Sequence, residues 1–137
     1  MKGFLDTSSL CKKYIEEEGS DTLVEFLNDL SDVIVSPICW IEMHSAVGRR
    51  VHEKEITSLE AARIYEEMKL DFNFFGKVIW NDDLEHKSVE LIRHYQLRTL
   101  DGIQLASAYL SQAEMFVTSD KKLFDIAKKE LRKVKFI

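Results

Sequence analysis

Short apolar segments alternate with helix-like patterns along almost the whole chain, and this alternation constrains the fold more than any other feature. Strands that alternate with helices are typical of α/β proteins, in which a helix connects one parallel strand to the next. We therefore predict a mostly parallel sheet covered by helices on both faces. The expected strands are residues 2–5, 33–35, 78–80, 115–117 and 134–136, and the expected helices are approximately 8–18, 20–30, 57–70, 83–95, 101–110 and 120–132, with a further helix after residue 36.

The length and composition indicate one domain over residues 1–137. The chain has 137 residues with 45% hydrophobic content, enough to bury one substantial core. No apolar run approaches the roughly 20 residues that span a bilayer, and Asp6 interrupts the N-terminus, so we expect a soluble, cytoplasmic protein. Cys11 and Cys39 have no paired spacing and are expected to be small buried residues. The net charge of −5 neither supports nor excludes nucleic-acid binding.

Several residues mark the expected helix ends. Gly19 is expected to end the first helix because glycine tolerates a left-handed conformation. Ser36-Pro37 is expected to begin a helix, with serine as the N-cap and proline at the first helical position. Thr57 is expected to begin the next helix in the same way.

Two aspartates follow expected strands directly. Asp6 comes after Gly3-Phe4-Leu5, and Asp120 comes after the segment that ends in Thr118-Ser119. Capping a helix could be the whole role of each aspartate. However, the carboxyl ends of parallel strands are also where α/β sheets gather their ligand-binding groups. The hydroxyl residues after Asp6 exceed what one cap needs, which favours a polar cup.

Two further acids lie on helices. Glu42 lies beside Ile38 and Ile41 at the edge of an apolar stripe, so full exposure is less expected than for an ordinary surface glutamate. Asp101 opens the least polar helix of the chain, with Gln104 one turn later. A favourable interaction with the helix dipole would explain Asp101 alone, but a buried cleft explains both polar residues.

Convergence of Asp6, Glu42, Asp101 and Asp120 would create an acidic pocket. Four close carboxylates repel one another, and a divalent cation with oxygen ligands relieves that repulsion. The absence of histidine and thiolate from this set favours Mg²⁺ or Mn²⁺ over zinc. The chemistry that such a site implies is metal-dependent hydrolysis of a phosphodiester.

The order of these residues resembles one known family. The pattern resembles the PIN-domain nucleases, and among them the VapC-type toxins of prokaryotic toxin-antitoxin pairs, over essentially the whole chain. The matching segments are Asp6-Thr7-Ser8-Ser9-Leu10, then Glu42, then Arg98-x-x-Asp101-Gly102-x-Gln104-Leu105-Ala106, and finally Thr118-Ser119-Asp120.

The resemblance implies a three-layer α/β/α sandwich and a Mg²⁺- or Mn²⁺-dependent endoribonuclease. It implies further that the four acids bind metal, that Thr7, Ser8, Gln104 and Thr118 support them, and that the chain is a homodimer inhibited by a small antitoxin. Gly102 departs from the alanine found in many relatives, and we expect it to weaken the start of that helix.

Other interpretations remain open at the level of sequence. One is a catalytically inactive PIN-like module that binds RNA or protein, and another is a phosphoryl-transfer protein with Asp6 as nucleophile, which the absence of a second aspartate two residues later disfavours. The aromatic residues could stack on bases or form the core. They include Trp40, Phe72, Phe74 and Phe75.

Overall fold

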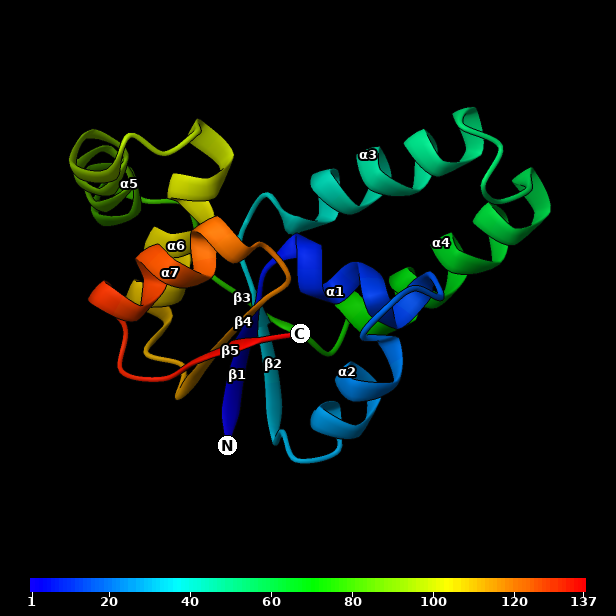
Figure 1. Cartoon of the computed structure of the whole chain (residues 1–137), viewed down its shortest axis with the longest axis horizontal. Coiled ribbons are helices and arrows are strands. Elements are labelled where there is room, and N and C mark those ends of the chain that lie inside the picture. Colours follow the sequence, from blue (N-terminus) through cyan, green and yellow to red (C-terminus); the bar gives the residue numbers. More distant parts are fainter.

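The computed structural model describes residues 1–137 and contains a five-stranded, entirely parallel sheet in the order β3-β2-β1-β4-β5 (Figure 1). This confirms the predicted α/β class. The strands are β1 (Lys2–Leu5), β2 (Asp32–Val35), β3 (Gly76–Lys77), β4 (Met115–Thr118) and β5 (Val134–Phe136). The helices are α1 (Thr7–Tyr14), α2 (Ser20–Leu27), α3 (Cys39–His52), α4 (Ser58–Phe72), α5 (Asp82–Tyr95), α6 (Thr99–Ser111) and α7 (Lys121–Glu130).

Helices cover both faces of the sheet because consecutive strand residues point to opposite sides. Phe4 faces one core and Leu5 the other, and Phe116 and Val117 of β4 divide in the same way. Helices α1 to α4 lie on the Leu5 side, and α5 to α7 lie on the Phe4 side (Figure 1). The result is a three-layer α/β/α sandwich.

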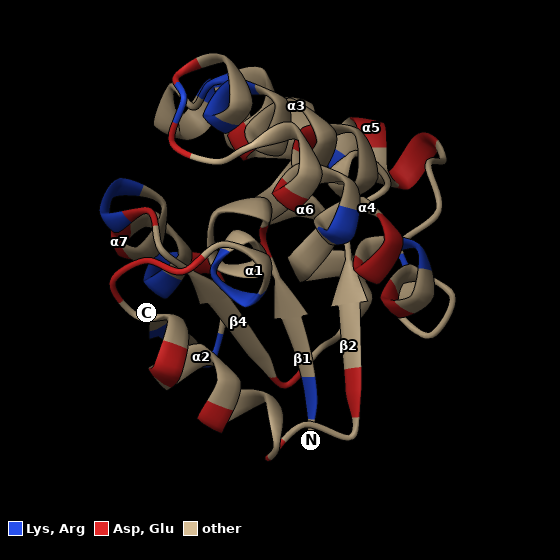
Figure 2. Cartoon of the chain, turned by 90° about the vertical axis from the view of Figure 1, so that its right-hand side faces the viewer, with Lys and Arg blue, Asp and Glu red and all other residues tan.

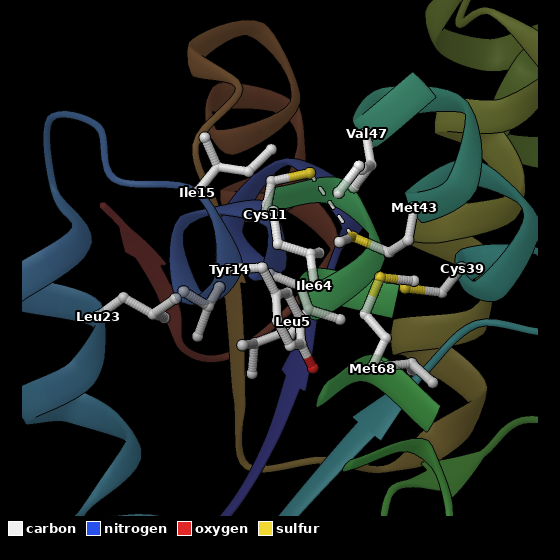
Figure 3. Close-up of a cluster of buried hydrophobic side chains, with 14 of the residues drawn as sticks. Leu5, Cys11, Tyr14, Ile15, Leu23, Cys39, Met43, Val47, Ile64 and Met68 are labelled. Carbon is white, nitrogen blue, oxygen red and sulfur yellow. Dashed lines mark hydrogen bonds between the residues drawn. The ribbon is translucent and has the colours of Figure 1, made fainter. Parts of the chain in front are cut away.

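The larger core lies between α1, α2, α3, α4 and the sheet (Figure 3). Leu5 and Val117 from the strands meet Leu10 of α1, Met43 of α3 and Met68 of α4, all without solvent exposure. Cys11 and Cys39 belong to this core as free thiols, as the sequence predicted. These contacts fix the start of α3 against α1, which matters for the position of Glu42.

The smaller core holds α6 against the sheet. Residues 102–108 of α6 are all buried, which confirms that this is the most enclosed helix of the chain. Gly102 allows α5 to approach closely, since a Cβ at this position would lie 2.8 Å from Cδ1 of Ile92 and closer still to Cγ1. The glycine is therefore explained by packing between α5 and α6.

Three local predictions about helix ends are wrong. Helix α1 ends at Tyr14 rather than Glu18, because Ile15 leaves the helix to enter the core, and Gly19 (φ 92°) instead precedes α2. Ser36 and Pro37 form a turn in which the Cys39 N–H donates to the Ser36 carbonyl, and α3 begins only at Cys39. An extended conformation is preferred for a residue before proline, which delays the helix.

The predicted strand over residues 78–80 is also wrong. The third strand is Gly76–Lys77, paired with Ile34 and Val35. Strand β2 ends at Val35, so only the Val78 N–H finds a partner there, the Val35 carbonyl at 3.0 Å. Ile79 and Trp80 are exposed beyond the sheet.

No helix combines the length and the apolar composition that spanning a lipid bilayer would require.

The close approach at Gly102 generates a prediction about stability. Gly102→Ala should lower the free energy of unfolding by about 1–3 kcal/mol, because Ile92 must move out of a packed interface. Gly48→Ala is the matched control, because Gly48 lies within α3 with open space around its Cα, and it should raise stability by about 0.5–1 kcal/mol. Urea denaturation measures both. Equal effects of the two substitutions would contradict the packing explanation.

Candidate active site

The candidate site lies at the edge of the sheet where the parallel strands end. Strands β1, β2 and β4 run side by side toward this edge (Figure 2). Asp6 directly follows β1, and its N–H donates to the Val117 carbonyl of β4 at 3.2 Å. The same pairing that builds the sheet therefore brings the two strand-to-helix junctions together.

The Asp6 carboxylate is buried and has a donor on each oxygen. Its Oδ1 accepts from the Ser9 N–H at 2.9 Å and from Ser8 Oγ at 2.8 Å, and its Oδ2 accepts from Thr118 Oγ1 at 2.5 Å. The Ser9 contact makes Asp6 the N-cap of α1, as one sequence interpretation expected. The contact with Thr118 joins this cap to β4 across 112 positions of sequence.

Burial raises the pKa of Asp6 from its usual 3.8 to about 6, and its hydrogen bonds with Thr118, Ser9 and Ser8 oppose this rise only in part. Asp6 forms no ion pair with a lysine, arginine or histidine. The site thus contains a buried carboxylate without a cationic neighbour, at 3% exposure. Such a group is costly when ionised and gains from a bound cation.

Asp120 belongs to the second junction. Its Oδ1 accepts from the Leu123 N–H at 3.0 Å as the N-cap of α7, and its own N–H donates to Thr118 Oγ1 at 3.0 Å. The Ser119 N–H donates to Ser8 Oγ at 3.0 Å. We call Asp6, Ser8, Thr118 and Asp120 the junction cluster, since these residues connect the β1–α1 and β4–α7 junctions.

Glu42 is held by a second set of polar contacts. Its Oε1 accepts from Thr7 Oγ1 at 2.9 Å and from Gln104 Nε2 at 2.6 Å. Gln104 Nε2 also lies 2.9 Å from Thr7 Oγ1. We call Thr7, Glu42 and Gln104 the helix cluster, because they come from α1, α3 and α6. Since Thr7 follows Asp6 directly, the two clusters adjoin.

One polar atom of Gln104 forms no hydrogen bond. Its Oε1 is buried and has no hydrogen-bond partner, while its amide nitrogen donates to Glu42 and Thr7. An unpaired buried oxygen is unusual and costs free energy. It is an acceptor without a partner on the residue that holds Glu42.

Asp101 lies in the first turn of α6, which begins at Thr99 rather than at Asp101 as predicted. It is three residues before Gln104, and 24% of its side chain is exposed. Its Oδ2 pairs with Arg98 Nε at 3.1 Å. The Arg98 side chain is 81% exposed, and such surface pairs are worth about 0–1 kcal/mol. Little free energy therefore holds Asp101 in this orientation.

The structure brings the predicted residues together only in part. Asp6 and Asp120 share Thr118, and Glu42 is joined through Gln104 to the helix that carries Asp101. Yet no three acidic, histidine or cysteine side chains are grouped so that they could hold a metal ion. Asp120 is engaged in capping α7, and Asp101 is engaged with Arg98.

Two residues of the matching segments hold parts of the site in place, although they were not predicted among its supporting groups. Ser9 Oγ donates to the carbonyls of Asp6 and Val117, at 3.1 and 2.9 Å, and so fastens α1 to β4. The unbroken run of hydroxyl residues after Asp6 was the feature of the sequence that indicated a role for Ser9. Arg98 pairs with Asp101, and the i,i+3 spacing in the sequence was its signal.

Comparison with known families agrees with this arrangement. The family model described as PIN domain matches residues 3–129. The chain therefore belongs to the PIN domain family, which confirms the resemblance found in the sequence. No curated protein matches the chain in sequence.

Several solved structures share the fold at low sequence identity. VapC20 of Mycobacterium tuberculosis, described as a toxin that cleaves the sarcin-ricin loop, is 17% identical, with a TM-score of 0.72 over 97% of this chain and 98% of that one. FitAcB of Neisseria gonorrhoeae is 16% identical, with a TM-score of 0.71 over 98% and 96%. A toxin-antitoxin complex of Klebsiella pneumoniae contains a chain that is 20% identical, with a TM-score of 0.68 over 89% of each.

The raised pKa of Asp6 predicts an unusual pH dependence in the presence of chelator. Because the folded chain binds this proton more tightly than the unfolded chain, Asp6 contributes stability below about pH 4 that is lost as the pH rises toward 6. The loss amounts to about 3 kcal/mol. Asp6→Asn should remove it and therefore unfold at a higher temperature than the wild type at pH 7.5.

Thermal unfolding of both proteins from pH 4 to 8 measures this difference. Asp32→Asn is the control, because Asp32 is exposed at the start of β2, away from the site. If the difference in unfolding temperature between the wild type and Asp6→Asn does not change with pH, Asp6 is not a costly buried charge.

Proposed function

We propose that this PIN-domain chain is a divalent-metal-dependent endoribonuclease and the toxin of a toxin-antitoxin pair. The observation that carries the proposal is the buried Asp6 carboxylate at the end of β1, which has no cationic neighbour and lies beside the contacts of Asp120 and Glu42. In a PIN domain, this arrangement is best explained by a site that takes up a cation.

The oxygen donors at this edge of the sheet suit a hard divalent ion in their chemistry, and binding would have to draw Asp101 and Asp120 toward Asp6 and Glu42, because the four acids are not grouped as a metal site in the structure. Asp6, Glu42, Asp101 and Asp120 supply carboxylate oxygens, and Gln104 Oε1 is a buried oxygen with no partner. Oxygen ligands without histidine or thiolate suit Mg²⁺ or Mn²⁺. When bound, such an ion would lower the pKa of a coordinated water and stabilise charge on a phosphodiester oxygen.

The remaining side chains orient these acids. Thr118 and Ser8 fix the Asp6 carboxylate, and Thr7 and Gln104 hold one oxygen of Glu42, leaving its second oxygen without a hydrogen bond from the chain. Asp101 can turn toward the site at small cost, because its partner Arg98 is mostly exposed. The chain thus prepares two acids rigidly and leaves one adjustable.

RNA as the substrate and toxicity as the role are supported by fold similarity. VapC20 is described as a toxin that cleaves the sarcin-ricin loop, and other structural relatives are toxin-antitoxin complexes. We propose the same class of substrate for this chain, with the cytoplasm as the place of action.

Cleavage of RNA with and without metal tests the activity. The wild type should cleave RNA with Mg²⁺ or Mn²⁺ and lose this activity in chelator. Asp6→Asn and Asp101→Asn should each reduce cleavage by more than about a hundredfold, whereas Thr118→Ala and Gln104→Ala, which remove supporting contacts, should cost roughly 10- to 100-fold. Asp32→Asn should leave the rate of cleavage unchanged, because Asp32 is at the beginning of β2 and the site lies where the strands end.

Metal binding is measured separately from activity by thermal unfolding, since a ligand of the folded state raises the unfolding temperature. Mn²⁺ should stabilise the wild type but not Asp6→Asn. A wild type that neither cleaves RNA nor responds to Mn²⁺ would identify the chain as a non-cleaving binding module. Equal cleavage by wild type and both aspartate variants would indicate a contaminating nuclease.

We also propose that protein partners cover the site: a small antitoxin and a second copy of the chain. Exposed apolar side chains flank two of the acids, with Ile41 (70% exposed) before Glu42 and Leu100 (48% exposed) before Asp101. Exposed apolar groups beside polar ones mark protein interfaces. An occupant placed on these residues would also shield the acids from substrate.

Sedimentation and inhibition experiments test the partners. The chain alone should sediment as a dimer, and Ile41→Glu or Leu100→Glu should weaken the dimer or the inhibition of cleavage by the proposed antitoxin. Leu59→Glu is the control, because Leu59 is similarly exposed at the start of α4. A monomer at all concentrations would disprove the homodimer.

A further inference from the structure

A polar and aromatic cavity lies on the β3 side of the molecule, apart from the two clusters. It has a volume of about 460 Å³, within the roughly 300–1,000 Å³ of typical small-molecule sites. The residues that line it are Trp40 of α3, Lys69 and Phe72 of α4, Asn73 directly after α4, and Lys77 of β3. None of the residues proposed to bind metal lines it.

The aromatic side of this cavity is formed by the rings of Trp40 and Phe72, which pack edge to face. The Trp40 and Phe72 ring centroids are 5.0 Å apart with an interplanar angle of 67°. The other aromatic contact of Trp40, with His44, is also edge to face at 68°. No ring of the chain stacks in parallel on the indole, which is only partly buried. The indole is therefore fixed in place without a stacking partner.

The charged side of the cavity is positive, although the whole chain has a net charge of −5. Lys77 forms no ion pair within the chain. Lys69 pairs with Glu66 at 3.0 Å, but both side chains are more than half exposed, so the pair is weak. No acidic residue lines the cavity. An anion can therefore approach both lysines.

The cavity lies close to the edge of the sheet that carries the acids. Lys77 pairs with Val35, the last residue of β2. Trp40 and Glu42 both lie in the first turn of α3, on different sides of that helix. Strand β3 is two strands away from β1, a distance of roughly 10 Å at the usual strand spacing. One flexible strand of nucleic acid can span this distance.

We propose that this cavity is a subsite for one unpaired base of a single-stranded RNA and its adjacent phosphate. The base stacks on Trp40 against Phe72, Lys77 and Lys69 bind the phosphate, and the Asn73 amide can hydrogen-bond to the base edge. The inference rests on the proposed function, because it assumes that RNA is the substrate. An apolar peptide side chain fits the cavity less well, since it would cover two lysines without pairing their charges.

Binding without cleavage tests the subsite. The titration uses a short single-stranded oligoribonucleotide in chelator, with Trp80→Phe as the background, so that fluorescence reports on Trp40 alone. RNA should quench the fluorescence, and an abasic strand of equal length should not. In the same background, Trp40→Leu should weaken RNA binding, followed by polarisation of a labelled strand, by about fivefold or more, whereas Trp40→Phe should retain most of it.

The phosphate contact has its own matched pair of variants. Lys77→Gln should lower the slope of log affinity against log salt by about 0.7, as expected for one lost contact with a single strand. Lys133→Gln is the control, because Lys133 directly precedes β5 and so lies at the opposite edge of the sheet. Circular dichroism establishes that each variant is folded.

Three outcomes would overturn the proposal. They are a lack of quenching by RNA, equal binding of the abasic strand, and equal effects of the Lys77 and Lys133 substitutions. If Trp40→Leu leaves RNA binding intact and instead shifts the monomer-dimer equilibrium, the occupant is a second copy of the chain. Cleavage of RNA without quenching of Trp40 overturns the subsite alone, and quenching without cleavage in Mn²⁺ overturns the nuclease alone.

Discussion

The burial of the Asp6 carboxylate between the ends of β1 and β4 is the interaction on which the rest of the site depends. Its two oxygens are held by Ser8, Ser9 and Thr118, so one charge organises two strand-to-helix junctions. Because burial penalises its charged form, its pKa rises to about 6. A fold that keeps such a group buried retains a free-energy cost that a bound cation would relieve.

The parallel sheet makes this arrangement geometrically simple. Because β1 lies at the centre, between β2 and β4, the residue after β1 is enclosed by the ends of both neighbours. The Phe4–Leu5 alternation then secures β1 to the cores on both faces. Asp6 is consequently fixed by backbone pairing and packing before its side-chain contacts are considered. The helix cluster is less central, because Glu42 and Gln104 come from helices that meet over the strand ends.

Much of the fold could be predicted because the signals were local. The strands at 2–5 and 134–136 and the Thr57 cap of α4 match the structure, since short apolar segments and capping residues act on their own part of the chain. The strand expected at 78–80 was wrong because a strand needs a partner, and β2 ends at Val35. Likewise, α1 ends early because Ile15 is drawn into a core that the sequence does not display.

The sequence by itself determined the α/β class, the positions of the acids relative to strands and helix starts, and the family, because these depend on short-range pattern and order. Only the tertiary structure decided which residues share a hydrogen bond. It joined Asp6 to Thr118 and Glu42 to Gln104, left Asp101 with Arg98, and placed Trp40 and Lys77 around one cavity. The physical reason is that side-chain partners far apart in sequence are selected by strand order and helix packing, which arise only when the whole chain buries its apolar faces.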